Sequence, residues 1–415
     1  MKKENRRDTR QLHLLINLKG YSDNNGFIFN ENPIDTITVS EKLQIKNVTS
    51  FKDFKDFFKT PWIVYKNNRN WVPPFWTEYK SFFKRTNPFW KHAEGKLYVA
   101  YKNNEIVGRV AAIIDHLYCK TYNQQIGFFG FFECIEDFEC AKALLKCAEN
   151  WLISRKMEIM RGSIDGRIDI GCGFLKNNFD SRPCFLSPYS PHYYIKFVKQ
   201  FGMKNERDLL LYYIDLKKPI PSKLKEKASK CESAGIKIRK FNRFRTGKEL
   251  KWWTNFFLQT FKDHWGFIPV STEEVRTRFG VKQMRWFIDS KLFLIAEFNN
   301  SPVAYIWSTP DYNQIFQNMN GRLGPYQFLQ FYMKKNNIKI GKLPLIGIKK
   351  EFRNQNIGSY LNYLTLKEMK KRGYIGAEVG WIDEKNKVAR STISITGAKL
   401  HKRLTVFEKK LNSTV

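Results

Sequence analysis

Apolar residues follow two patterns along the first half of the chain, one with the spacing of strands and one with the spacing of helices. Strand-like runs lie at residues 42–48, 96–101, 106–114, 125–134 and 157–164, and helical spacing occurs at residues 51–60 and 137–156. The polar sequence KNNE between the second and third runs predicts a hairpin. The first half is therefore predicted to form a strand, a hairpin, a strand, a long helix and a strand.

The same order of elements is predicted a second time after about residue 220. Strand-like runs lie at residues 235–241, 341–352, 375–382 and 402–411, a hairpin at 291–310, and helical patterns at 247–265, 271–289, 356–374 and 386–398. The charged, proline-bearing stretch 215–227 separates the two series. We therefore expect a mixed α/β fold with domains at 40–220 and 221–415, preceded by a basic extension at 1–39.

The charge balance is strongly basic, with 72 lysines and arginines against 39 acidic residues and a formal net charge of +33. Such a chain attracts nucleic acid, an anionic membrane surface or a phosphorylated co-substrate, although solvated surface charge explains part of the excess equally well. The seven cysteines form no CxxC pair or zinc-like cluster with histidine, so we predict no metal and a reduced compartment. The sequence contains no run of about 18 apolar residues, the length that could span a bilayer.

The sequence KKEFRNQNIGSYL, from Lys349 to Leu361, joins a predicted strand to a predicted helix. A helix N-terminus offers unpaired backbone N–H groups, and a suitable turn before it lets them converge on one anion. Arg353 adds positive charge, and Asn356 is of the residue type that, after glycine, best tolerates positive φ. The stretch is a candidate phosphate-binding turn, although an ordinary solvated helix start has the same features.

Several further stretches between residues 40 and 411 match one group of proteins. They are NWVPPF, NPFWKHAE, GFFGFFEC, GFLKNNFDSRP, PYSPHYY, HWGFIPVSTEE, PDYNQIF, NGRLGP, GWIDEKN and FEKKL. With the order of elements, they resemble the GNAT acyltransferase superfamily, and within it the tandem GNAT group that includes bacterial ceramide synthases. The superfamily's turn for pantetheine and pyrophosphate has the pattern Arg/Gln-x-x-Gly-x-Gly/Ala; here Arg353 and Gly358 match, and Asn356 replaces the first glycine.

The resemblance implies two GNAT-like domains, each a mixed, mostly antiparallel sheet flanked by helices. It also implies acyl-CoA or acetyl-CoA as a co-substrate, with no permanently bound cofactor. A strand would hold the pantetheine, the turn would hold the pyrophosphate, and an asparagine after the next strand would cap a helix or bind the carrier. The residues at these places are Ile346, Gly347, Ile348, Arg353, Asn354, Gln355, Asn356, Ile357, Gly358, Ser359 and Asn386.

Acyl transfer to an amine requires a base for the amine and an acid or other stabilising group for the leaving thiolate. The superfamily often has a tyrosine as the acid on its last helix, and Ile393 stands at that place here. Glu378, on the strand that faces the acyl carrier, is our candidate base, and His401 is a candidate proton donor. The alternatives are an exposed strand glutamate and a surface histidine.

The first half lacks the phosphate turn, because the acidic sequence ECIEDFEC follows its aromatic strand. We therefore expect no CoA binding in this half; the aromatic strand either lines a lipid path or packs in the core. Glu133 on this strand would be costly to bury unpaired, so it is either exposed or functional. Together with polar residues of PDYNQ and NGRLGP, it forms our candidate acceptor site: Glu133, Asp311, Asn313, Arg322 and Tyr326.

The favoured hypothesis is an acyl-CoA-dependent N-acyltransferase acting on the amine of a sphingoid-type long-chain base. Its partners would be acyl-CoA, a lipid amine and an anionic membrane, with the protein cytoplasmic and peripheral on the inner face of the cell membrane. A second hypothesis is the same chemistry with a soluble amine or peptide. A third is nucleic-acid binding, which the charge favours but which no recognised nucleic-acid motif supports.

Overall fold

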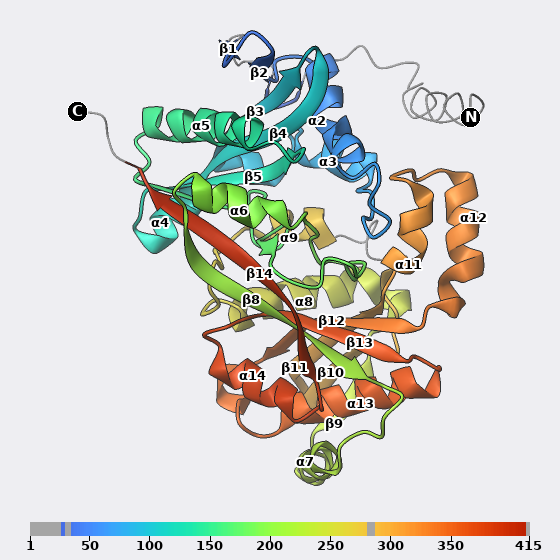
Figure 1. Cartoon of the computed structure of the whole chain (residues 1–415). Helices are drawn as coiled ribbons and strands as arrows, with labels where there is room; N and C mark the ends of the chain where they lie inside the picture. Colours follow the sequence, from blue (N-terminus) through green and yellow to red (C-terminus); the bar gives the residue numbers. More distant parts are fainter. Residues whose placement is uncertain (1–25, 30–34, 280–286, 412–415) are drawn as a thin grey trace, which may run out of the picture.

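The computed structural model describes residues 26–29, 35–279 and 287–411, which fold around one continuous sheet (Figure 1). Strands follow one another in the order β1-β2-β3-β4-β5-β6-β14-β8-β13-β12-β11-β10-β9, with β7 paired to β14. Their bounds are β1 Thr36–Thr38, β2 Leu43–Asn47, β3 Ala93–Lys102, β4 Glu105–Asp115, β5 Ile126–Cys134, β6 Ile159–Gly162, β7 Phe174–Leu175, β8 Lys204–Asp215, β9 Lys237–Lys240, β10 Phe293–Phe298, β11 Ser301–Pro310, β12 Ile340–Ile348, β13 Gly376–Asp383 and β14 Lys399–Lys410.

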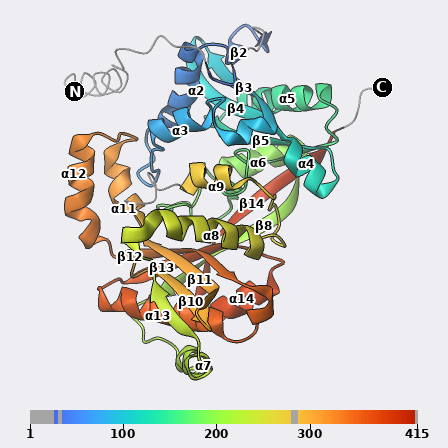
Figure 2. The same ribbon diagram turned by 180° about the vertical axis from the view of Figure 1, so that it is seen from behind.

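Helices cover both faces of this sheet, as the front and back views show (Figures 1 and 2). The α-helices are α2 Phe51–Val64, α3 Trp76–Phe82, α4 His116–Tyr122, α5 Phe138–Ser154, α6 Tyr193–Gln200, α7 Ser222–Ser233, α8 Thr246–Thr260, α9 Thr272–Phe279, α11 Asn313–Phe316, α12 Pro325–Lys334, α13 Ile357–Lys371 and α14 Lys387–Ser394. Short 3-10 turns are η1 Pro88–Lys91, η2 Arg243–Arg245, η3 Gln317–Met319, η4 Lys335–Asn337 and η5 Lys350–Phe352. Among the described residues, no helix combines the length and apolar character needed to cross a membrane.

The two halves of the chain repeat one arrangement of strands. Hairpin β3–β4 turns at Asn103–Asn104 and hairpin β10–β11 turns at Asn299–Asn300, and all four asparagines have positive φ. Two consecutive residues with positive φ are typical of the tight turn that matches strand twist, and asparagine accepts this conformation readily. Each hairpin is followed by a parallel pair of strands, β5–β6 and β12–β13, in an otherwise antiparallel sheet. The predicted mixed, mostly antiparallel α/β fold is confirmed.

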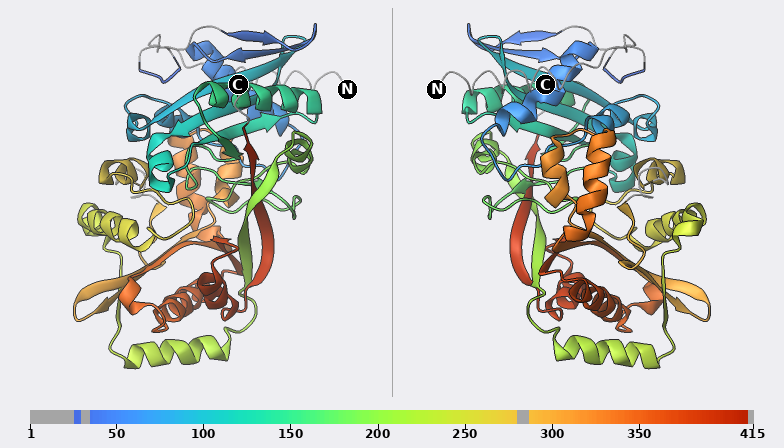
Figure 3. Two further views of the ribbon diagram at one scale, coloured as in Figure 1. Left: turned by 90° about the vertical axis from the view of Figure 1, so that its left-hand side faces the viewer. Right: turned by 90° about the vertical axis from the view of Figure 1, so that its right-hand side faces the viewer.

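The last strand of each half lies in the sheet of the other half. β8 pairs with β13, β14 pairs with β6, and β8 and β14 pair with each other over nine residue pairs. The side views show this long antiparallel pair joining the upper and lower parts of the molecule (Figure 3). Sequence patterns missed β8 altogether and treated the start of α7 as a linker. The domain bounds 40–220 and 221–415 therefore remain a proposal, with one sheet running through both.

Three apolar clusters form the core. One consists mainly of first-half side chains and one mainly of second-half side chains, and the third mixes both, such as Phe54 and Phe57 with Trp253 and Trp307. All seven cysteines are buried as free thiols. Of the predicted basic extension 1–39, residues 1–25 and 30–34 lie outside the described residues, as do residues 280–286 of the helix predicted at 271–289.

Candidate active site

The turn between β12 and α13 adopts the conformation that its sequence predicts. Asn354 and Asn356 have φ of 69° and 61°, so the chain turns sharply before entering the helix. The side chain of Asn356 does not cap α13; its Oδ1 accepts a hydrogen bond of 3.1 Å from Lys227 Nζ. Within the described residues, the backbone N–H groups of residues 354–359 donate no hydrogen bond to the protein. The turn is therefore open to an acceptor that carries negative charge.

Positive charge and close backbone packing accompany these free N–H groups. Arg353 lies at the turn, where its guanidinium donates to the carbonyl of Thr260 at 3.4 Å and stays partly exposed. Gly358 packs tightly, because a Cβ there would lie 3.3 Å from Ile348 and 3.4 Å from Thr392. The turn before α13 thus combines free backbone N–H groups, the helix dipole and the cations Arg353 and Lys227, which fits a phosphate or pyrophosphate.

Strands β12 and β13 separate next to this turn. Their parallel pairing covers Ile340 to Leu343 on β12 and ends at Val379 on β13. Beyond that point, β12 pairs within the described sheet only with β11, on its other side. Residues Ile346, Gly347 and Ile348 lie in this separated part, and Gly347 leaves room for the Tyr305 ring, 2.5 Å from where a Cβ would lie. The opening is the place that our sequence analysis assigns to the acyl carrier.

A buried charged cluster lies where the two strands begin to separate. Glu378 Oε1 accepts hydrogen bonds from Lys342 Nζ at 2.7 Å and Ser187 Oγ at 2.8 Å, and both Lys342 and Glu378 are 1% exposed. The alternative of an exposed strand glutamate is therefore wrong. Burial alone would raise the pKa of Glu378, but Lys342, Lys402 and Ser187 together hold it below its usual value. Glu378 is therefore a carboxylate at neutral pH.

Strand β14 adds two more titratable groups. Lys402 is buried, and its Nζ donates to the carbonyls of Ser181 and Arg182 at 3.2 and 3.1 Å. The half-buried His401 ring lies 5.5 Å from the Tyr213 ring, centre to centre. Burial and the charge of Lys402 lower the pKa of His401, so the ring is largely neutral near pH 7. A neutral imidazole accepts a proton from an amine more readily than it protonates a thiolate.

The polar residues of PDYNQ anchor a loop over this cluster. Asp311 is 1% exposed and its Oδ1 accepts a hydrogen bond of 2.8 Å from the Phe185 N–H, while Asn313 Nδ2 donates to the Pro183 carbonyl at 3.0 Å. Arg322 and Tyr326 instead have exposed side chains. The structure thus joins Asp311 and Asn313 to the charged cluster through the 181–187 loop and does not bring Arg322 and Tyr326 into it.

Asn386 serves as a helix cap. Its Oδ1 accepts a hydrogen bond of 3.0 Å from the Ala389 N–H at the start of α14. Such a cap is worth about 1 kcal/mol. Of the two roles that the sequence left open for Asn386, the structure therefore shows capping. Ile393, at the place of the expected tyrosine, is buried in the apolar cluster of the second half.

The first half has a different helix start and a closed strand pair. The carboxylate of Asp137 accepts hydrogen bonds from the N–H groups of Glu139 and Cys140 at 3.0 and 3.3 Å, so α5 caps itself. On β5, Glu133 is neither exposed nor unpaired: it accepts a hydrogen bond of 2.8 Å from Tyr194 Oη and lines a cavity of about 60 Å³. Burial raises the pKa of Glu133 to about 7. Sequence analysis identified Glu133 but not its partners.

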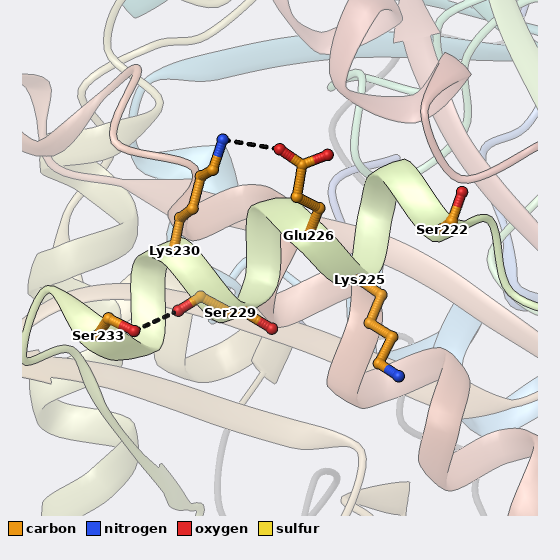
Figure 4. A pocket seen from close by; sticks show the side chains of 6 residues that line it. All are labelled: Ser222, Lys225, Glu226, Ser229, Lys230 and Ser233. Atoms are coloured by element: carbon orange, nitrogen blue, oxygen red, sulfur yellow. Dashed lines mark hydrogen bonds and ion pairs between the residues drawn. The ribbon is translucent and has the colours of Figure 1, made fainter.

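A surface depression lies elsewhere, along one face of α7 (Figure 4). Its lining residues come from this helix alone, and Glu226 forms an ion pair of 2.7 Å with Lys230. No second element brings a catalytic group toward them. In the described part of the chain, no group of histidine, cysteine or acidic side chains could hold a metal ion.

Two repeated units with exchanged last strands, one of which has an open turn next to its separated parallel strands, form a tandem GNAT fold. A solved tandem GNAT protein from the clavulanic acid biosynthesis pathway has the same fold, with a TM-score of 0.52 at 10% identity over 90% of this chain and 100% of that one. No protein-family model matches the chain. The tandem GNAT fold that the sequence predicted is confirmed.

Two proteins resemble the chain in sequence along nearly its whole length. Protein YghO of Escherichia coli (strain K12) is 28% identical over 389 residues, covering 89% of this chain and 98% of that protein. The bacterial ceramide synthase of Caulobacter vibrioides (strain NA1000 / CB15N) is 27% identical over 377 residues, with the same coverage. The chain is thus similar to the group that its short sequence stretches indicate.

Proposed function

We propose that this protein is an acyl-CoA-dependent N-acyltransferase that transfers a fatty acyl group to the amine of a sphingoid-type long-chain base. The observation that carries the proposal is the open turn at the N-terminus of α13, with unpaired N–H groups and positive charge beside separated strands. The similarity to a ceramide synthase supports the choice of a lipid amine. The excess of basic residues favours binding to an anionic membrane surface.

The residues present fit a CoA-type ligand. The N–H groups of residues 354–359 and Arg353 would hold the pyrophosphate, and the open edge of β12 at Ile346–Ile348 would hold the pantetheine. This ligand supplies the activated acyl group. The chain's own contribution is to place that group at the separated strands, where Glu378 and Lys342 lie buried next to the opening.

Glu378 and His401 are the proposed proton-handling residues. Glu378 is ionised and buried, so it would attract the ammonium form of an acceptor; because its pKa is lowered, it would pass the amine's proton on to water rather than keep it. His401, largely neutral, is the second proposed proton acceptor. It lies on β14, which pairs with one side of β8, whereas Glu378 lies on β13, which pairs with the other side. Asp311 and Asn313 would position the acceptor indirectly, because they hold the loop that carries Ser187 over the cluster.

The test is release of free thiol from acyl-CoAs of increasing chain length, with and without a sphingoid base, and mass spectrometry of the lipid products. We expect release that depends on the base and on a long acyl chain, and a large loss in Arg353→Glu. Lys196→Glu, an exposed lysine on α6, is the matched charge control. Turnover with acetyl-CoA alone would replace the lipid amine by a soluble acceptor, and absence of CoA binding would overturn the proposal.

A further inference from the structure

Exposed apolar side chains gather on one segment of the surface. Of the thirteen large apolar side chains that are exposed in the described part of the chain, six lie between Leu323 and Met333, on or next to α12. They are 46–69% exposed: Leu323, Tyr326, Phe328, Leu329, Tyr332 and Met333. Exposed apolar side chains scattered singly are ordinary, but such a cluster marks an interaction surface. We call Leu323, Tyr326, Leu329, Tyr332 and Met333 the α12 face.

The α12 face is held in place from behind. Phe331 is the buried residue of the helix, and its ring packs against those of Phe287, Tyr312 and Phe316. The segment before the helix is fixed to the first half, since Trp62 Nε1 donates to Asn320 Oδ1 at 2.8 Å. The helix therefore stands on the flank of the molecule (Figures 1 and 3), with its outer apolar side chains toward solvent.

The charge around this face selects among possible partners. Residues 312–341 contain no aspartate or glutamate and four lysines and arginines. Lys335 Nζ lies 4.2 Å from the centre of the Tyr332 ring, so positive charge borders the apolar residues directly. Two copies of so basic a face would repel each other, whereas tyrosine, leucine and methionine bordered by lysine suit the boundary between anionic headgroups and acyl chains.

The α12 face also adjoins the candidate active site along the chain. α12 leads through η4 into β12, the strand whose separated part we assign to the acyl carrier. We infer that the α12 face docks the protein on an anionic lipid surface, with the outer side chains inserted among the lipids. This inference deepens the proposed function, since a long-chain base resides in that surface, and it names the part of the protein that meets the membrane.

The experiment is flotation of the full-length protein with vesicles of phosphatidylcholine, with and without phosphatidylglycerol. We expect binding to the anionic vesicles, weakened at least about tenfold in Leu329→Glu/Met333→Glu because charge replaces inserted apolar groups. In Lys334→Gln/Lys335→Gln we expect the preference for phosphatidylglycerol to decrease. The matched control is Val39→Glu/Phe244→Glu, which replaces two other exposed apolar side chains with the same charges.

Three results would overturn the inference. They are no vesicle binding by the wild-type protein, equal losses in the control and the α12 variant, and a wild-type dimer that only the α12 variant converts to monomer. Unchanged thermal unfolding of both variants excludes misfolding. Thiol release with a detergent-dispersed base separates the two proposals: the α12 variant retains it if only docking is lost, whereas vesicle binding without any turnover refutes the proposed function and leaves docking standing.

Discussion

The two halves of the molecule use the same pair of parallel strands in opposite ways. In the second half, β12 and β13 separate after four residue pairs, and the following turn leaves its N–H groups free. In the first half, β5 and β6 also separate after four pairs, but the chain closes the gap: Phe129 O accepts from the Ile164 N–H at 2.9 Å, and Asp165 Oδ1 accepts from the Phe131 N–H at 2.5 Å.

The helix starts differ in the same sense. The residue before α5 is Asp137, whose carboxylate accepts hydrogen bonds from the N–H groups that an anion would need. The residue before α13 is Asn356, whose side chain turns away to Lys227. One fold therefore yields an open anion site in one half and a self-capped helix in the other. The difference lies in the residue before the helix, Asn356 or Asp137, and in the segment after β6 that closes the gap in the first half. We propose that the first half supports the site and binds no CoA.

The largest expected effect comes from separating the halves. Because β8 and β14 are exchanged, residues 1–220 or 221–415 alone would each lack a strand in the middle of the sheet and expose unpaired edges. We expect neither fragment to unfold cooperatively when purified, as measured by circular dichroism during heating.

Cutting the intact protein provides the control for this experiment. A protease site placed at the exposed residues 217–219 should leave two fragments that elute together, because the nine residue pairs of β8 and β14 still join them. A fragment 221–415 that folds alone and binds CoA would show that the halves are independent, and would break the comparison.

The next effect concerns the charged cluster at the β12–β13 pair, where Lys342 and Glu378 form a buried ion pair. Removing one partner of a buried ion pair leaves an uncompensated charge and costs about 3–5 kcal/mol. We expect this loss in Lys342→Met or Glu378→Leu alone, measured by urea unfolding, and recovery of most of it in the double variant. The double variant should still lack acyl transfer.

The register of the strands places Phe128 and Arg161 of the first half where the second half has Lys342 and Glu378. Arg161 pairs at 2.8 Å with Glu408, which is 34% exposed, so Glu408→Gln should cost less than about 1 kcal/mol. Full activity of the folded Lys342→Met/Glu378→Leu variant would rule out a catalytic role for this cluster.

Glu133 gives the first half a pH dependence of its own. Burial raises its pKa from 4.5 to about 7, so the folded protein retains this proton over a range where the unfolded chain has lost it. Stability should therefore fall by up to about 3 kcal/mol as pH rises from 4.5 to 7. Glu133→Gln should remove this slope in urea unfolding, while Glu139→Gln, at an exposed position of α5, should preserve it. An unchanged slope in Glu133→Gln would contradict the assignment.

Sequence patterns predicted the local elements, such as hairpins and turns, and missed the strand pairings and side-chain contacts between distant segments. Both hairpins and the turn at Asn356 follow from residues that accept positive φ, and the structure has them. β8 is missing from the sequence-based prediction because its apolar run LLLYYI adjoins the charged stretch that separates the two predicted halves, although the run itself is typical of a strand.

The candidate site shows the same limit. Glu378 was assigned to its strand, but Ser187 and Lys402 reach the cluster from a loop and from the exchanged strand β14. Ser187 contacts Glu378 across 191 residues of sequence, and Lys402 contacts the Ser181 carbonyl across 221; no periodicity within one element carries such information. Sequence patterns could not indicate Ser187 and Lys402 as neighbours of Glu378, because a distant loop and the exchanged strand β14 bring them there.

The smallest effect is the most specific test of the difference between the two helix starts. Asn356→Asp keeps size and tolerance of positive φ but gives α13 the carboxylate that α5 has at Asp137. A negative charge beside the pyrophosphate site should weaken CoA binding about tenfold, equivalent to about 1.4 kcal/mol, while the helix dipole keeps stability near that of the wild type. Isothermal titration with CoA measures the first effect and thermal unfolding the second.

The reciprocal Asp137→Asn should leave CoA affinity unchanged, because α5 keeps a capping side chain and faces no ligand. If instead Asp137→Asn altered CoA binding as much as Asn356→Asp, the first half would hold a CoA site, and the contrast between an open and a self-capped helix would fail.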